Sequence, residues 1–136
     1  MVVIGSLVTH YLGGWDKMIE ALIVFMIIDY ISGVSVALFF KNSPKTEDGK
    51  LSSKVGFKGL CRKCMILLCV IVGYWVDVLI GTDVTRNAVI IGFATNEIIS
   101  FVENLGAMNL TVPKALLNAI KLLKSKAEGE DTNERN

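Results

Sequence analysis

The sequence contains few of the side chains on which most catalytic and metal sites depend. Its 136 residues include one histidine and three cysteines, and no second cysteine pair accompanies the Cys61-x-x-Cys64 pattern. A structural zinc site needs four such ligands, so we interpret both cysteines as small apolar side chains and not as a metal or redox pair. The formal net charge of +1 provides no basic excess for nucleic acid. We therefore expect no enzymatic activity, no cofactor or metal, and no nucleic-acid partner.

Charge is also almost missing from two long stretches of the chain. Residues 21–40 contain Asp29 as their only charged residue, and residues 64–82 contain only Asp77. Because a helix rises about 1.5 Å per residue, about 20 such residues cross a bilayer core of about 30 Å. The whole chain is 52% hydrophobic, with a mean hydropathy of +0.54. These features predict an all-α integral membrane protein.

The composition divides the chain into four segments. We expect a short apolar segment at residues 1–14, a transmembrane region at 15–110, a basic amphipathic helix at 111–127 and a polar tail at 128–136. Within the transmembrane region, three helices are predicted at about 18–40, 60–81 and 87–105. Residues 1–12 are short for a span, so we expect them at the interface. A loosely attached leader and a fourth span are the alternatives.

Basic residues gather at one end of the predicted helices. They are frequent in the first loop with its flanks and again after the third helix, whereas the turn between helices two and three contains only Arg86. The positive-inside rule then predicts that the first loop and the C-terminus are cytoplasmic. The residues expected at this membrane surface are Lys54, Lys58, Arg62, Lys63, Lys114, Lys121 and Lys124.

The acids inside the apolar runs need an explanation. A carboxylate at bilayer depth costs at least about 2.5–3.5 kcal/mol, so Asp29 should face a partner or water, or be protonated. Gly33 and Ala37 follow it at helical steps and form a ridge of small residues that another helix can approach closely. We expect Asp29 on this packed face, with a lone structural acid as the alternative. Asp77 is expected to reach the interface or to form a local ion pair.

The third predicted helix carries a polar stripe. Its members, which we expect to share one face, are Asn96, Glu97, Ser100, Glu103 and Asn104. Lipid disfavours such a stripe, and one chain offers little to pair with its two acids, since Arg86 lies near the opposite end of the helix. We therefore expect self-association or a water-filled lumen. Packing of the stripe against the second helix of the same chain is the alternative.

The last helix is amphipathic. Leu116, Ile120 and Leu123 share one face, and Lys114 and Lys121 lie on the opposite face. A basic amphipathic helix of this kind suits an anionic inner leaflet. Packing on a partner subunit is the alternative.

Three pieces of the sequence, in this order and spacing, resemble the toxin-secretion and phage-lysis holins. They are the helix with Asp29, Gly33 and Ala37, the stretch 52–63 that opens the second helix, and the stretch 96–120. The resemblance covers about residues 15–125 and implies a non-enzymatic phage or prophage protein of the bacterial cytoplasmic membrane. It also implies lesions opened at a set time, through which an endolysin or a toxin passes. Such proteins often have a second start that yields a shorter inhibitor, for which Met18 is the candidate.

Two functions follow as hypotheses. The preferred one is a self-assembling protein that permeabilises the membrane, with other copies and lipids as its partners. An endolysin is then a functional partner without direct contact. The alternative is a small ion channel or transporter subunit of fixed stoichiometry, in which Asp29 and Glu97 line a proton or cation pathway.

Overall fold

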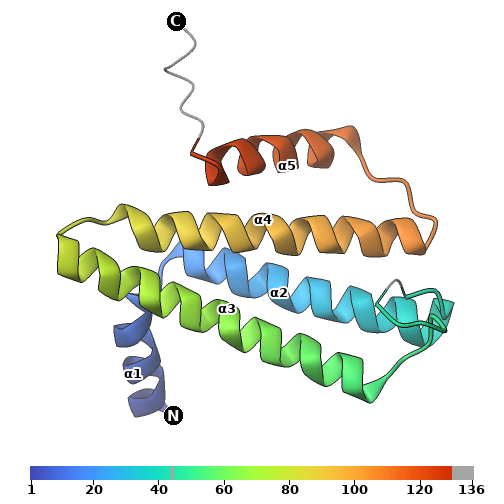
Figure 1. Ribbon diagram of the computed structural model, residues 1–136, viewed down its shortest axis with the longest axis horizontal. Coiled ribbons are helices and arrows are strands. Elements are labelled where there is room, and N and C mark those ends of the chain that lie inside the picture. The colour runs from blue at the N-terminus through green and yellow to red at the C-terminus, as the bar shows by residue number, and fades with distance from the viewer. Residues whose placement is uncertain (44, 130–136) are drawn as a thin grey trace, which may run out of the picture.

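The computed structural model describes residues 1–43 and 45–129, and every regular element in that part of the chain is a helix (Figure 1). The elements, in order, are α1 (Val2–Leu12), α2 (Lys17–Ser35), the π-helix η1 (Val36–Phe40), α3 (Ser53–Ile80), α4 (Val84–Ala107) and α5 (Lys114–Ala127). The predicted all-α fold class is confirmed. Of the predicted polar tail, residues 130–136 lie outside the described residues.

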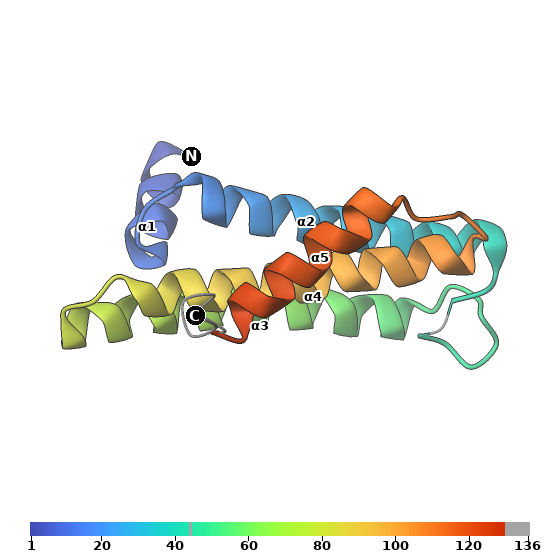
Figure 2. The same cartoon turned by 90° about the horizontal axis from the view of Figure 1, so that it is seen from above.

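Three helices are long and apolar enough to cross a membrane. α2 with η1 has 24 residues, α3 has 28 and α4 has 24. They lie side by side, with α4 in contact with both α2 and α3 (Figures 1 and 2). At 1.5 Å per residue, α3 is about 42 Å long and exceeds the hydrocarbon core of a bilayer. One end of α3 therefore reaches into a headgroup region when the bundle spans a membrane.

Apolar side chains of these helices meet inside the bundle. The buried cluster consists of Leu12, Ile19, Leu22, Met26, Ile66, Val70, Ile90 and Ala94. Other large apolar side chains, including Ile31, Val72 and Leu79, point outward and remain exposed. A soluble monomer rarely exposes a large contiguous apolar surface, whereas lipid tails solvate one readily. The distribution of apolar side chains is that of a membrane bundle.

α3 begins at Ser53, well before the start predicted at about residue 60. The hydroxyl of Ser52 accepts a hydrogen bond from the backbone N–H of Val55 at 3.4 Å and caps the helix. Gly56 and Gly59, which by composition belong to the predicted loop, instead lie where α3 passes the ring of Tyr30. The earlier start places residue 63 about 15 Å along the helix rather than near its first turn.

α1 runs across the long helices instead of along them (Figures 1 and 2). Its 11 residues end at Leu12, and the next residue, Gly13, caps the helix with a φ of 84°, in the left-handed region. Leu12 is buried, and the rings of His10 and Tyr11 pack against Trp75 of α3. A helix of this length, about 16 Å, does not cross a bilayer. α1 is therefore not among the helices long enough to span, and its interfacial position stays a prediction.

α5 crosses α4 obliquely (Figure 2). Ile120 is buried on the side that faces α4, and Leu116 and Leu123 are half-buried beside it. Lys114 and Lys121 are exposed. The predicted apolar face of this helix thus contacts α4 of its own chain, and its binding to a lipid surface stays a prediction.

Candidate functional site

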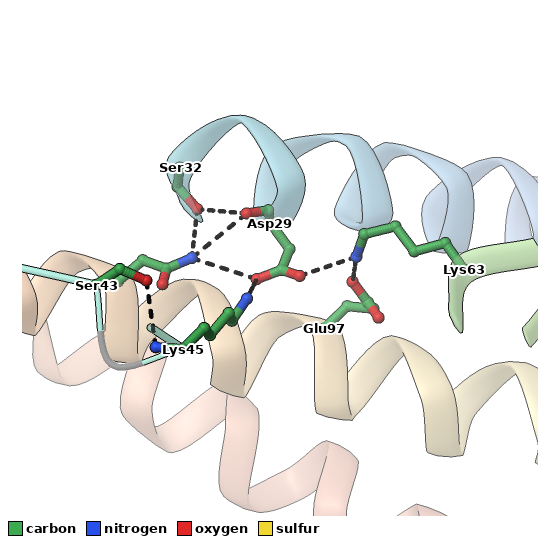
Figure 3. Close-up of polar contacts among 7 residues, drawn as sticks. Asp29, Ser32, Ser43, Lys45, Lys63 and Glu97 are labelled. Atoms are coloured by element: carbon green, nitrogen blue, oxygen red, sulfur yellow. Dashed lines mark hydrogen bonds and ion pairs between the residues drawn. The ribbon is translucent and has the colours of Figure 1, made fainter. Parts of the chain in front are cut away.

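A cluster of charged side chains lies between the three long helices (Figure 3). Asp29 comes from α2, Lys63 from α3 and Glu97 from α4. Lys63 Nζ donates to Asp29 Oδ2 at 2.8 Å and to Glu97 Oε2 at 2.5 Å. The two acids are 4% and 8% exposed, and the lysine side chain is 14% exposed. One ammonium group therefore pairs two carboxylates that belong to different helices.

The position of Lys63 corrects two expectations. Lys63 was expected at the membrane surface because it lies among the basic residues that flank the loop. One chain was also expected to offer little that could pair with the acids of the third helix. Both are wrong for Lys63 and Glu97, because α3 begins early and carries this lysine well inside the helix. Its long aliphatic stem then brings the ammonium group to the interior.

An amide extends the cluster along α2. Asn104 Nδ2 donates to Ser32 Oγ at 2.8 Å and lies 3.3 Å from both the backbone oxygen and Oδ1 of Asp29. The hydroxyl of Ser32 in turn donates to the Asp29 backbone oxygen at 2.9 Å. Asn104 is fully buried, so these bonds satisfy an amide that is costly to leave unpaired.

A second lysine approaches Asp29 from the loop between η1 and α3. Lys45 Nζ lies 4.0 Å from Asp29 Oδ1, and its backbone N–H donates to Ser43 Oγ at 3.2 Å (Figure 3). Sequence reasoning missed both Lys45 and Ser32 as members of the cluster. No local pattern distinguishes this lysine from its loop neighbours, since only the fold of the loop brings it to α2.

The polar stripe of α4 divides into two faces. Glu97 and Asn104 are buried and Ser100 is half-buried, so these three side chains face the bundle. Asn96 and Glu103 are exposed on the outside of α4. The expectation that all five residues share one face is wrong, because steps of one residue turn the helix by about 100°. Packing within one chain, the alternative considered for this stripe, applies to its inner half.

The ridge of small residues, which runs from α2 into η1, also faces α4. Asp29 and Ala37 are buried, and Gly33 is half-buried between them. A Cβ atom on Gly33 would lie 3.6 Å from Asn104 Nδ2 and 3.6 Å from Lys45 Nζ. In the described structure the ridge therefore packs within one chain, against the polar cluster.

Asp77 forms no ion pair among the described residues, contrary to one expectation from the sequence, while its position at the membrane interface stays a prediction. Its carboxylate accepts hydrogen bonds from the backbone N–H groups of Thr85 and Arg86, each at 2.9 Å, and from Thr82 Oγ1 at 2.7 Å. These bonds satisfy N–H groups at the start of α4, which would otherwise lack partners. Asp77 thus caps the helix, and this explains why α4 begins at Val84, earlier than the predicted residue 87.

The side chain of Arg86 joins the turn after α1 to α4. It is 5% exposed and donates from Nε to the Leu12 backbone oxygen at 2.6 Å, and from Nη2 to the Gly14 backbone oxygen at 3.2 Å. Its Nη1 also donates to Asp16 Oδ2 at 2.8 Å. This guanidinium hydrogen bond holds the pKa of Asp16 below its usual value. Sequence reasoning missed the role of Arg86, which only the folded turn reveals.

The other basic residues predicted at the membrane surface are exposed. They are Lys54, Lys58 and Arg62 on the first turns of α3, and Lys114, Lys121 and Lys124 on α5. Their exposure suits contact with water or with lipid headgroups.

The charged cluster holds three helices together. It couples α2, α3 and α4 through one buried lysine, and breaking such a pair by removing one partner costs about 3–5 kcal/mol. In lipid, opening the cluster leaves polar groups that only water or other protein groups can satisfy. The cluster of Asp29, Lys63 and Glu97 therefore links the three long helices of one chain, and we refer to it as the latch.

Comparison with known proteins gives consistent results. A model of the bacteriophage holin family matches residues 6–125. An uncharacterised protein of Listeria monocytogenes is 37% identical over 93% of this chain and 85% of its own length. An uncharacterised 14.9 kDa protein of Clostridium perfringens is 33% identical over 93% of this chain and 89% of its own. A protein of Bacillus phage phi105, named "Probable holin", is 29% identical over 85% of this chain and 80% of its own.

No protein of known structure matches this chain. The family match covers all three long apolar helices and supports a multi-pass, non-enzymatic protein of the cytoplasmic membrane. This chain belongs to the bacteriophage holin family.

Proposed function

We propose that this protein oligomerises in the bacterial cytoplasmic membrane and opens lesions through which an endolysin or a toxin leaves the cell. The observation that carries the proposal is the buried cluster of Asp29, Lys63 and Glu97 in a member of the holin family. A protein that only needed to span the membrane would gain little from two acids at this depth, because burying them is costly.

The cluster suggests how lesion opening is delayed. In a single chain Lys63 pairs both acids, so the bundle can stay in lipid without exposing them. When the helices separate, the freed carboxylates require water or groups from other copies. Depolarisation of the membrane can bias this step, since moving one charge across it is worth about 2.3 kcal/mol per 100 mV.

The outer face of α4 supports self-association. Asn96 and Glu103 are exposed on α4, one helical repeat of seven residues apart, and lipid disfavours both. Asn96 lies beside Lys124 and Ala127 at the end of α5, so this face becomes fully open only when α5 leaves α4. Contact between copies along this face would remove these side chains from lipid. An endolysin then needs no contact with this protein, because it leaves through the opened membrane.

The orientation follows from the basic residues. The loop between η1 and α3, the first turns of α3, and α5 carry most of the lysines, and the positive-inside rule places these parts in the cytoplasm. α1 and the turn between α3 and α4 then lie at the outer surface. α5, released from α4, would lie on the anionic inner leaflet with its lysines toward the headgroups.

A product that starts at Met18 would differ from the full chain in one defined way. It would lack α1 and with it Leu12, Gly14 and Asp16, which accept the hydrogen bonds of Arg86. A buried guanidinium without these acceptors is costly, so the shorter product should pack differently at the outer end. This difference gives a physical basis for a form that delays assembly.

Expression in bacteria tests the proposal. The full chain is produced with and without a muralytic enzyme that has no export signal, while membrane potential, culture density and release of a cytoplasmic enzyme are followed. We expect an abrupt loss of potential after a delay, followed by lysis only when the muralytic enzyme is present. Steady growth with an intact potential at high expression would contradict the proposal.

The charged cluster at membrane depth also favours a second function, a channel or transporter subunit of fixed stoichiometry. In that case Asp29 and Glu97 would carry protons or cations between the long helices. The same experiment separates the two functions. A transporter moves a defined solute without releasing the muralytic enzyme, and its assembly keeps one size as expression rises.

A further inference from the structure

A cavity of about 480 Å³ opens between α2, α3 and the loop that joins η1 to α3. Its lining carries four basic side chains and only two acidic ones, namely Lys45, Lys58, Arg62, Lys63, Asp29 and Glu97. The rest of the wall is largely apolar and includes Val34, Ala37, Val55 and Ile66. The cavity is thus amphipathic, with a net positive charge.

The charges within the cavity are unequally paired. Lys63 is held by the two acids at the inner end. In the described part of the chain, no carboxylate forms an ion pair with Lys58 or Arg62. The hydroxyl oxygen of Thr46, also in the lining, is buried and has no hydrogen-bond partner among the described residues. These groups suit a ligand that brings negative charge and hydrogen-bond acceptors.

The level of the cavity in the bundle indicates the kind of ligand. If the end of α3 at Ile80 lies at one interface, a hydrocarbon core of about 30 Å ends about 20 residues earlier, near residue 60. Lys58 and Arg62 then lie where phosphate groups of the other leaflet are found. Val34 of α2 and Ala37 of η1 also line the cavity, six and three residues before the end of this apolar span at Phe40, so they lie on the acyl-chain side of the same leaflet.

We propose that this cavity binds one anionic phospholipid, with its phosphate between Lys58 and Arg62 and an acyl chain along α2. Thr46 donates a hydrogen bond to a phosphate oxygen in this arrangement. α3 diverges from α2 toward the loop end, where the lining residues of both helices lie (Figure 1). Basic pockets between transmembrane helices bind anionic headgroups elsewhere by the same charge complementarity. The inference requires that the helices span a bilayer, but it does not require lesion opening.

Photolabelling in liposomes tests the site. The full chain is reconstituted in phosphatidylcholine vesicles with a trace of photoactivatable phosphatidylglycerol or photoactivatable phosphatidylcholine, and labelled peptides are mapped by mass spectrometry. We expect phosphatidylglycerol to label residues 30–37 and 51–66 in preference to the neutral lipid. The double variant Lys58→Gln/Arg62→Gln should lose this preference by about 30-fold, the order expected for two basic residues at a membrane surface.

Two further variants serve as controls. Lys54→Gln/Lys114→Gln removes the same charge from exposed residues outside the lining and should label like the unchanged chain. Lys58→Arg/Arg62→Lys keeps both charges and should also retain the preference, which separates loss of the site from misfolding. Equal labelling by the two lipids, or equal loss in both Gln variants, would overturn the proposal. So would complete competition by soluble glycerol phosphate, because the ligand would then be the phosphate alone.

The labelling result is independent of lysis. A chain that shows the lipid preference but never releases a muralytic enzyme would contradict the proposed function and leave the lipid site standing. A chain that lyses cells without any lipid preference would contradict the site alone.

Discussion

Lys63 and Asp29 lie 34 positions apart in the chain, yet the lysine Nζ and the aspartate Oδ2 meet at 2.8 Å inside the bundle. Glu97, another 34 positions along, shares the same ammonium group. Each residue alone would be a costly charge at membrane depth. Together they join α2, α3 and α4 at one point within the single chain.

Replacing Lys63 by Met tests the latch directly. The change leaves two buried carboxylates unpaired, so we expect a loss of about 3–5 kcal/mol in the free energy of unfolding. Thermal unfolding in detergent, followed by circular dichroism, measures it. Lys54→Met, at an exposed position of the same helix, should change stability by no more than about 0.5 kcal/mol. Adding Asp29→Asn and Glu97→Gln to Lys63→Met should recover much of the loss, and equal effects of the two single lysine variants would contradict the latch.

The two acids of α4 should differ in their effect on lysis timing. Glu97 is buried and paired with Lys63, whereas Glu103 is exposed. We expect Glu97→Gln to shift the onset of lysis earlier, because it weakens the latch. Glu103→Gln should act only through contacts between copies and shift the onset less. Culture density after induction, at matched protein levels, measures both, and unchanged timing in both variants would count against a role for the polar stripe.

The outer end of the bundle should respond to acid through Asp16. The hydrogen bond from Arg86 lowers the pKa of Asp16 in the folded protein. A carboxylate with a lowered pKa stabilises the fold fully above its unfolded pKa, which is about 3.9, and loses this contribution as pH falls through the folded pKa. We therefore expect the turn after α1 to loosen only below about pH 4. Fluorescence of the nearby Trp15 should report the transition, and Asp16→Asn should show none of it. A fluorescence transition of equal size in Asp16→Asn would show that another titratable group causes it.

The turn after α1 should tolerate no side chain at Gly13. A Cβ atom there would lie 2.7 Å from Tyr74 Cγ, and the φ of 84° disfavours any residue other than glycine. We expect Gly13→Ala to destabilise the docking of α1 on α3 by about 1–3 kcal/mol. Limited proteolysis in detergent measures the docking. Gly5→Ala is the matched control, because a Cβ atom at that position has no neighbour within 4 Å. Equal cleavage of the two variants would show that α1 is not held through this turn.

Periodicity and local composition were sufficient to predict the long helices but not to predict the residues at which they begin. Apolar runs of about 20 residues predict membrane helices from length alone, and α2, α3 and α4 follow them. The start of α3 was misplaced because glycines suggest a loop, while the cap at Ser52 outweighs them. The start of α4 was missed because its capping group, Asp77, belongs to the preceding helix.

The cluster could be anticipated only in part. Asp29 and Glu97 are conspicuous because a lone acid in an apolar run demands a partner. Their partner, Lys63, could not be identified from the sequence because it is one of many lysines near the loop. How deep Lys63 lies in the bundle depends on where α3 begins. Asn96 and Glu103 were grouped with the inner residues because spacings of three and four residues do not separate two adjacent helix faces.

The sequence by itself determined that this chain is a helical membrane protein, because hydrophobic length is a property of each segment alone. It also marked the acids that lipid cannot accept and the order of motifs that the holin family shares. Only the tertiary structure decided which charge meets which acid, since Lys63, Asp29 and Glu97 come together through the packing of three helices far apart in the chain. Pairing at such distances depends on helix rotation and depth, and neither is encoded in a local pattern.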